Sequence, residues 1–276
     1  MFVRLRFPQT ADASDLQARM IAYDPLGFLE EEHWWEVYFD RDAWERSESA
    51  FRSACERDGI APTFEREEIA KENWNELWEQ SIEPIQVSDH LFIAPSWKTV
   101  DAPSGSMIIT IDPKMSFGTG YHATTRLMLR LLERHVRAGD RVLDMGTGTG
   151  VLAIAAVRLG AMLAEGLDTD EWSYDNALEN AQRNGVADRV LLGQGSIENV
   201  EGTFDVILSN ITKIDNLQML PRFDVHLNPG GRIILSGFYE WDARDIHLAL
   251  EQLRLHVDEE ITEDEWSAIA ARKEDI

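Results

Sequence analysis

Three polar residues stand where buried strands are predicted to end. Asp144 precedes the glycine turn Gly146–Gly150, Asp168 ends "GLD", and Asn210 ends "ILSN". The carboxyl ends of parallel strands share one edge of a sheet, and ligands bind there. A carboxylate beside a tight turn suits a cationic amino group, and an acidic group at the next strand end can accept hydrogen bonds from ribose hydroxyls. An amide oxygen can accept one from an amine. The three positions therefore predict a binding site at this edge.

The spacing of the glycines separates the candidate cofactors. A dinucleotide-binding turn would carry glycine at 146, 148 and 151. Position 151 is valine here, and the glycines stand at 146, 148 and 150, so nicotinamide dinucleotide is only the second choice. Asp144, the spaced glycines and Asp168 together indicate a nucleoside that carries an amino acid. S-adenosylmethionine is such a molecule.

Each of these residues also has a purely structural explanation. Glycine suits many helix entrances for backbone reasons, and Asn210 could form a turn. Asp168 could cap the following helix, although Asp170 is better placed for that role. His122, in a turn before a helix, is expected first to fix the loop and only second to relay protons.

The elements that must position these residues fall into two patterns. The N-terminal region predicts the order βαββαβ, which is typical of a small ferredoxin-like α+β domain, with strands at 2–7, 26–31, 34–39 and 62–66 and helices at 12–23 and 42–57. From about 113 onward, strands and helices alternate as in a Rossmann-like, doubly wound, mostly parallel sheet of the α/β class. Its strands are predicted at 141–144, 163–167, 190–192 and 205–210 and after "NPGG", with a C-terminal antiparallel hairpin.

Between these regions lies a connecting stretch, 67–112, that contains Trp74, Trp78 and Trp97. These tryptophans are expected to anchor packing between domains. The predicted division is therefore an N-terminal domain at 1–66, the connecting region at 67–112 and a cofactor-binding domain at 113–276.

Composition limits the classes of function. The chain has 276 residues, 44% of them hydrophobic, and a net charge of −24 from 50 acidic and 26 basic side chains. This charge favours cationic partners and argues against direct nucleic-acid recognition. Cys55 is the single cysteine, so neither an internal disulfide nor a metal centre is expected. No stretch predicts a membrane span or a secretory leader, and a soluble cytoplasmic protein is expected.

Several longer motifs carry a resemblance to a known family. They are "SFGTGYHATTRL", "VLDMGTGTGVLAIAAVRLGA", "GLDTDEWSYDNALENAQRNGV", "DVILSNI", "NPGGRIILSGF" and the tryptophan-containing connector. In these motifs the chain resembles the bacterial ribosomal protein L-eleven (L11) methyltransferases, the PrmA family of class I S-adenosylmethionine-dependent enzymes. The likeness runs from about residue 65 to the end and is weaker in the N-terminal domain. The first motif and the connector are much narrower signatures than the glycine turn.

The resemblance implies that Thr125, Gly146, Asp168 and Asn210 contact the cofactor. It also implies that the N-terminal domain presents a basic ribosomal protein, whose lysine and N-terminal amines the second domain methylates. Asn210 is predicted to be the catalytic group that orients the amine. The family usually has a small residue at the position of Lys213, whose side chain is predicted to reach solvent or pair with Asp215.

The glycine-rich stretch 116–125 precedes the first strand of the parallel sheet. It is expected to form a second wall of the cofactor pocket, opposite the Gly146 turn, with Phe117 and Thr125 facing the ligand. The complete set of predicted cofactor contacts is Phe117, Gly118, Thr119, Thr125, Asp144, Gly146, Gly148, Gly150, Asp168, Ser196 and Asn210.

Two other functions fit the same motifs. A class I enzyme could methylate a different protein lysine, such as one in an electron-transfer flavoprotein subunit, or a small amine, because this fold hosts many substrates. A protein without catalytic activity could bind the cofactor and use its N-terminal domain for interactions. The undamaged motif set disfavours this last alternative.

Overall fold

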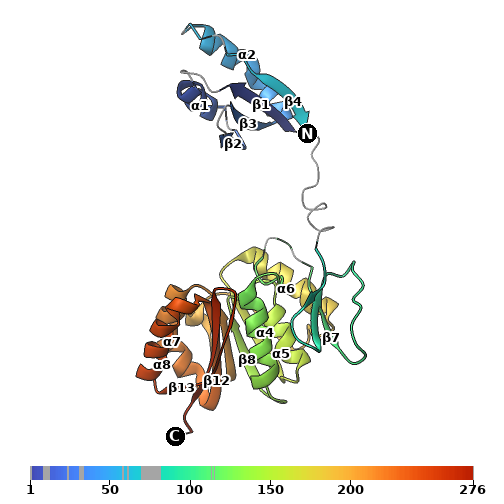
Figure 1. Cartoon of the computed structure of the whole chain (residues 1–276), viewed down its shortest axis with the longest axis vertical. Helices are drawn as coiled ribbons and strands as arrows, with labels where there is room; N and C mark the ends of the chain where they lie inside the picture. The colour runs from blue at the N-terminus through green and yellow to red at the C-terminus, as the bar shows by residue number, and fades with distance from the viewer. Residues whose placement is uncertain are drawn as a thin grey trace. The chain divides into compact units, whose positions relative to one another are not determined.

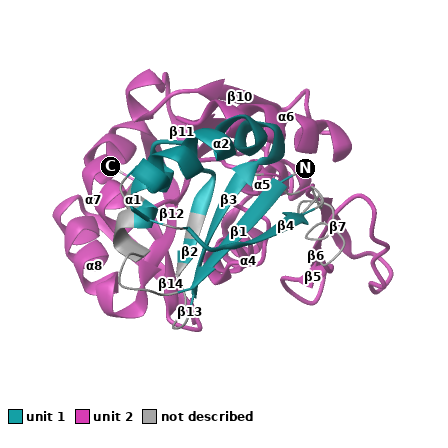
Figure 2. Cartoon of the chain, turned by 90° about the horizontal axis from the view of Figure 1, so that it is seen from above, with its two compact units in different colours: residues 1–81 teal, residues 82–276 magenta. Residues whose placement is uncertain are grey.

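The computed structural model divides the chain into two compact units, Met1–Ser81 and Ile82–Ile276 (Figures 1 and 2). It describes residues 2–8, 13–23, 25–30, 34–57, 59–60, 62–69, 82–112, 114 and 116–275. Trp74 and Trp78 lie outside the described residues, so their packing role stays a prediction. The predicted three-part division also stays a prediction, although residues 82–112 group with the larger unit.

The first unit has the predicted βαββαβ order. Its elements are β1 (Phe2–Pro8), α1 (Ala13–Ile21), β2 (Gly27–Glu30), β3 (Trp34–Asp40), α2 (Arg41–Arg57) and β4 (Glu65–Ile69). The strands form an antiparallel sheet in the order β2-β3-β1-β4, as in ferredoxin-like domains. β4 begins at Glu65 rather than at the predicted Pro62, whose nitrogen has no hydrogen to donate to a sheet.

Alternation along β1 builds the core of this unit. Val3, Leu5 and Phe7 are fully buried, while Arg4 and Arg6 on the other face pair with the buried carboxylate of Glu36. The core residues are aromatic to an unusual degree, namely Phe7, Trp35, Phe39, Trp44 and Phe51. Large rings bury much apolar area for few residues, which a unit of this size needs.

The second unit begins with a small sheet that the sequence did not predict. Its strands are β5 (Ile85–Gln86), β6 (Leu91–Ala94) and β7 (Met107–Thr110). The remaining elements follow the predicted alternation and are α4 (Ala123–His135), β8 (Arg141–Met145), α5 (Val151–Arg158), β9 (Leu163–Asp168), α6 (Glu171–Arg183), β10 (Val190–Gln194), η1 (Ile197–Asn199), β11 (Phe204–Asn210), α7 (Lys213–His226), β12 (Leu227–Tyr239), η2 (Glu240–Asp242), α8 (Ala243–Gln252), β13 (Leu255–Glu263) and β14 (Trp266–Lys273).

A seven-stranded sheet organises this unit. Its order is β10-β9-β8-β11-β12-β14-β13. The first five strands are parallel, and β14 and β13 form the predicted antiparallel hairpin. The sheet is therefore the doubly wound class that the motif spacing predicted.

Helices cover both faces of the large sheet (Figure 1). Along the strands, Val142 and Val206 pack with α4, α5 and α6, whereas their neighbours Leu143 and Ile207 pack with α7 and α8. Because successive strand residues point to opposite faces, continuous apolar runs are needed here. In the described part of the chain, no helix is long and apolar enough to cross a membrane.

Candidate active site

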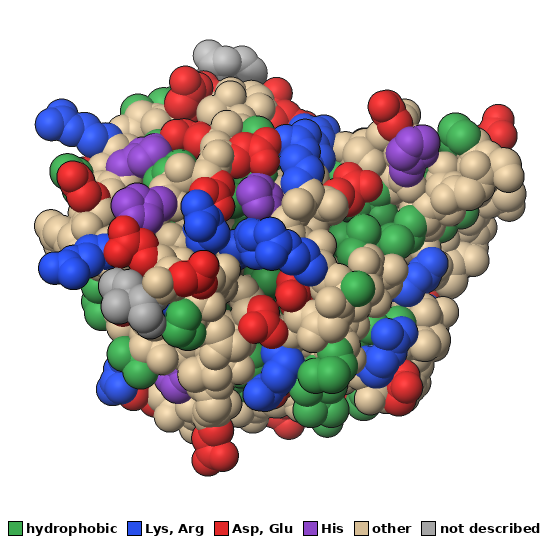
Figure 3. Space-filling view, turned by 90° about the horizontal axis from the view of Figure 1, so that it is seen from below, with side chains coloured by type: hydrophobic (Ala, Val, Ile, Leu, Met, Phe, Trp, Pro, Cys, Tyr) green, Lys and Arg blue, Asp and Glu red, His purple; other side chains and the backbone are tan. Residues whose placement is uncertain are grey.

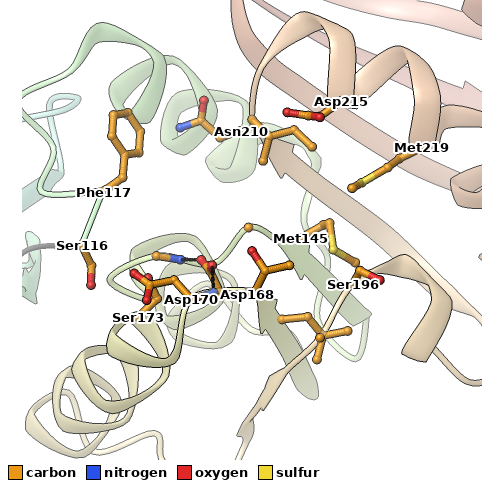
Figure 4. Close-up of a pocket in the computed structure, with 16 residues that line it drawn as sticks. Ser116, Phe117, Met145, Asp168, Asp170, Ser173, Ser196, Asn210, Asp215 and Met219 are labelled. Carbon is orange, nitrogen blue, oxygen red and sulfur yellow. Dashed lines mark hydrogen bonds between the residues drawn. The ribbon is translucent and has the colours of Figure 1, made fainter.

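A cavity of about 480 Å³ lies at the carboxyl ends of β8, β9, β10 and β11 (Figure 4). Some of the predicted contacts line it, namely Phe117, Gly146, Gly148, Asp168, Ser196 and Asn210. The other predicted residues are not in its lining, namely Gly118, Thr119, Thr125, Asp144 and Gly150. The lining also includes residues that the motifs did not single out: Ser116, Met145, Leu167, Thr169, Asp170, Ser173, Gly195, Ile211, Asp215 and Met219.

Asp168 ends β9 and faces the cavity with a fixed carboxylate. Its Oδ2 accepts a hydrogen bond from the Gly148 amide at 2.9 Å, and its Oδ1 accepts one from the Asp170 amide at 3.0 Å. Each carboxylate oxygen can accept further bonds, so Asp168 keeps acceptor capacity toward the cavity. Asp170 caps α6 by accepting from the Trp172 amide at 3.1 Å, as predicted.

The turn after β8 requires glycine for close approach at Gly146 and Gly148. Their φ angles are 73° and 54°. A Cβ on Gly146 would lie 2.6 Å from Ile211 Cγ2, and one on Gly148 would lie 2.3 Å from the Phe117 carbonyl oxygen. Gly150 has a different role, because it begins α5 and a Cβ there would lie 3.1 Å from the Ala177 Cβ in α6.

The two glycine-rich turns touch each other directly. The Thr149 amide donates to the Phe117 carbonyl at 2.8 Å, and the Thr149 hydroxyl donates to the Gly118 carbonyl at 2.7 Å. Gly118 therefore serves the contact between the turns. The side chain of Phe117 is 53% exposed at the edge of the cavity (Figure 4).

Asp144 lies beneath the turn and is fully buried. Its Oδ2 accepts from the Thr147 hydroxyl at 2.7 Å and from the Ala153 amide at 3.2 Å. Its Oδ1 has no hydrogen-bond partner among the described residues. Burial raises the pKa of Asp144 to about 6, against the lowering effect of the bond from Thr147. The carboxylate thus joins the turn to α5 rather than lining the cavity beside an amino group.

The start of α4 holds His122 in a structural role. His122 caps the helix, because its Nδ1 accepts from the Thr124 amide at 3.3 Å. Burial, and then the charge of Arg126, lower the pKa of His122, which keeps the ring neutral and able to accept. The expected loop-fixing role is confirmed. Thr125 is fully buried, and its hydroxyl has no partner within the described part of the chain.

Asn210 ends β11 at the wall of the cavity. Its Oδ1 is buried and accepts no hydrogen bond from any described residue. The predicted pairing of Lys213 with Asp215 is wrong. Lys213 Nζ lies 2.5 Å from Asp242 and 3.1 Å from Asp245. Asp215 instead accepts from the Thr212 hydroxyl at 2.6 Å, at the start of α7.

The cavity fits a ligand that carries a nucleoside at one end and an apolar-flanked reactive group at the other. Its volume falls in the range of ligand-binding cavities, and Asp168 offers acceptors for hydroxyl groups. Apolar walls come from Met145, Leu167, Ile211 and Met219. Asn210 adds an acceptor that lacks a protein partner. Among the described residues, no group of three or more His, Cys, Asp or Glu side chains could hold a metal ion.

The sheet order, the terminal hairpin and the strand-end carboxylate at the cavity define a class I methyltransferase. A family model described as Ribosomal protein L11 methyltransferase (PrmA) matches residues 14–274. The chain therefore belongs to the ribosomal protein L11 methyltransferase (PrmA) family. Its cofactor is S-adenosylmethionine.

Named relatives and a solved structure agree with this assignment. The chain is 39% identical over 274 residues to a ribosomal protein L11 methyltransferase of Chlorobaculum tepidum, covering 96% of this chain and 94% of the relative. It is 41% identical over 215 residues to one of Pelotomaculum thermopropionicum, covering 78% and 70%. A crystal structure of ribosomal protein L11 methylase from Lactobacillus delbrueckii subsp. bulgaricus is 35% identical, with a TM-score of 0.65, and covers 70% of this chain and 100% of that chain.

Proposed function

We propose that this enzyme transfers methyl groups from S-adenosylmethionine to amines of ribosomal protein L11, with lysine side chains and the N-terminal amine as acceptors. The observation that carries the proposal is the unpartnered Oδ1 of Asn210 at the cavity wall, which is an acceptor suited to the N–H of an amine. The names of the relatives supply the ribosomal protein.

Cofactor binding would use the groups at the carboxyl edge of the sheet. Asp168 would accept hydrogen bonds from the ribose hydroxyls, since its carboxylate is already oriented by two backbone amides. Gly146 and Gly148 would let the backbone approach the ligand. Ser196, which begins η1 at the cavity, would border the nucleoside. The cofactor, when bound, supplies a methyl group activated by its sulfonium.

Asn210 would position the acceptor. A lysine amine has an ordinary pKa of about 10.4 and must lose its proton before it can attack. The apolar walls at Met145, Ile211 and Met219 disfavour the charged ammonium, because desolvation lowers an amine pKa. Asn210 would then accept a hydrogen bond from the neutral amine and aim its lone pair at the methyl carbon. Because His122 caps α4, it is not assigned as the base.

The partner would be a basic protein. The net charge of −24 complements a cationic ribosomal protein and would speed its association. We assign its recognition to the N-terminal unit, and a cytoplasmic location follows from a ribosomal substrate. Acidic and basic side chains are interspersed over the face drawn in Figure 3, so charge on that face is not gathered into one patch.

Radiolabelled cofactor tests this function. The enzyme is incubated with labelled S-adenosylmethionine and either ribosomal proteins or whole lysate, and mass spectrometry identifies the labelled band. Label on amines of L11 is expected, together with a large loss of rate in Asn210→Ala at unchanged protein stability. Label on a different protein, or on a small amine, would refute the L11 assignment while leaving methyl transfer intact.

A further inference from the structure

A continuous series of aromatic rings leads out of the cavity. Phe117 lies at the edge of the cavity, with its ring 5.4 Å from that of His122. The His122 ring lies 4.6 Å from Trp266, and Trp266 stacks on Tyr239 at 4.2 Å. Tyr239 in turn stacks on Trp241 at 4.6 Å, with their planes 16° apart. The series therefore connects the methyl-transfer site with the surface.

Its outer end is open to solvent. Trp241 is 65% exposed and Tyr239 is 36% exposed. One face of Trp241 stacks on Tyr239, so the exposed area includes the opposite face of the indole. A ring that only filled the core would be buried, and the inner rings already occupy that role.

Backbone and ionic contacts hold this outer end beside Asn210. A Cβ on Gly237, near the end of β12, would lie 1.8 Å from the carbonyl oxygen of Ile211, which is the residue after Asn210. The Glu240 amide donates to the Glu265 carbonyl at 2.9 Å and ties η2 to the β13–β14 turn. Lys213, at the start of α7, pairs with Asp242 next to Trp241.

The charges around these rings select a cation. Glu240 and Glu265 are exposed neighbours of the rings in sequence, and their carboxylates have no ionic partner within the described part of the chain. The nearby cation, Lys213, is already paired with Asp242 and Asp245. Tryptophan is the best aromatic partner for a cation above its ring face, and unpaired carboxylates add attraction of the same sign.

We propose that Tyr239 and Trp241, with Glu240 and Glu265 beside them, form a subsite for a cationic side chain of the substrate protein next to the amine being methylated. The proposal rests on the proposed function, because it assumes a basic protein substrate. The acceptor amine itself does not occupy this subsite, since it must be neutral when it attacks. The subsite would hold a neighbouring lysine or arginine and thereby favour acceptors in basic surroundings.

Kinetics with ribosomal protein L11 provide the first test. Trp241→Leu keeps apolar bulk but removes the ring, and we expect it to raise KM for L11 by about two- to fivefold, with kcat and cofactor Kd unchanged. Trp241→Phe, which restores a ring, should recover most of the lost KM. Trp172→Leu is the matched control, because Trp172 is 76% exposed and stacks on no ring among the described residues; its KM should equal that of the parent.

A pair of peptides tests the charge. Both carry one acceptor lysine, flanked in one by arginine and in the other by citrulline, and both binding and methylation are measured. The parent should prefer the arginine peptide, and Trp241→Leu should abolish that preference. An equal loss for both peptides, or an unchanged KM, would overturn the subsite. Absence of methylation by the parent would refute the proposed function instead, and the binding preference would still decide the subsite.

Discussion

The buried carboxyl of Asp144 predicts an unusual dependence of stability on pH. Burial raises its pKa from 3.8 to about 6 in the folded enzyme. Between about pH 4 and pH 6 the unfolded chain has released this proton while the folded enzyme still binds it. The folded state then binds more protons, so this group lowers stability as pH rises. The full loss, reached above pH 6, is about 3 kcal/mol.

Asp144→Asn removes this titration and retains the shape. An amide oxygen can still accept from Thr147 and Ala153, while the added NH₂ occupies the position of the unpartnered Oδ1, at a cost that does not vary with pH. Relative to the parent, the variant should therefore gain about 1.5 kcal/mol of unfolding free energy between pH 5 and pH 7.5. Urea unfolding followed by circular dichroism measures the difference above the sequence pI of about 4.6.

The control is Asp188→Asn, which removes the same charge from an exposed turn after α6. It should change unfolding free energy little, and equally at both pH values, because exposed charges interact weakly. If Asp144→Asn and the parent differed by a constant amount from pH 5 to pH 7.5, the burial argument would be refuted. A variant that lost stability as pH rose would indicate that the folded enzyme stabilises the ionised carboxylate.

Three further changes test other parts of the site. Asp168→Ala should weaken cofactor binding at least tenfold, because a charged acceptor is lost; calorimetric titration showing near-normal affinity would mean that the ribose binds elsewhere. Gly148→Ala should cost more stability than Gly139→Ala, since both glycines have positive φ but only a Cβ on Gly148 would meet the Phe117 carbonyl, at 2.3 Å. Equal denaturation midpoints would contradict that close approach. His122→Ala should lose about 1 kcal/mol of stability with its cap and keep the pH–rate profile of the parent, whereas a shifted profile would favour a proton relay.

Strand ends were the most informative feature of the sequence. Asp168 and Asn210 line the cavity as their positions indicated, because parallel strands bring their carboxyl ends to one edge. The alternation of apolar strands and helices likewise predicted the sheet. The short strands β5, β6 and β7 escaped prediction, since runs of two to four residues carry too little periodicity.

Side-chain direction at the turns could not be predicted in the same way. Asp144 and Asp168 occupy equivalent strand ends, yet Asp144 points beneath the turn to Thr147 and Ala153. Gly150 and Thr125 belong to the expected motifs but pack against neighbouring helices or lie in the core. Motif spacing therefore located the turns without separating their ligand-facing residues from their packing residues.

The sequence by itself determined the fold class, the family motifs and the two strand-end groups of the site, because local periodicity and the chirality of parallel connections leave few alternatives. Only the tertiary structure decided which members of each motif reach the cavity, how Lys213 is withdrawn toward Asp242, and that Trp241 stacks outward from Tyr239. These features depend on contacts between segments far apart in the chain, and local sequence patterns carry no record of such contacts.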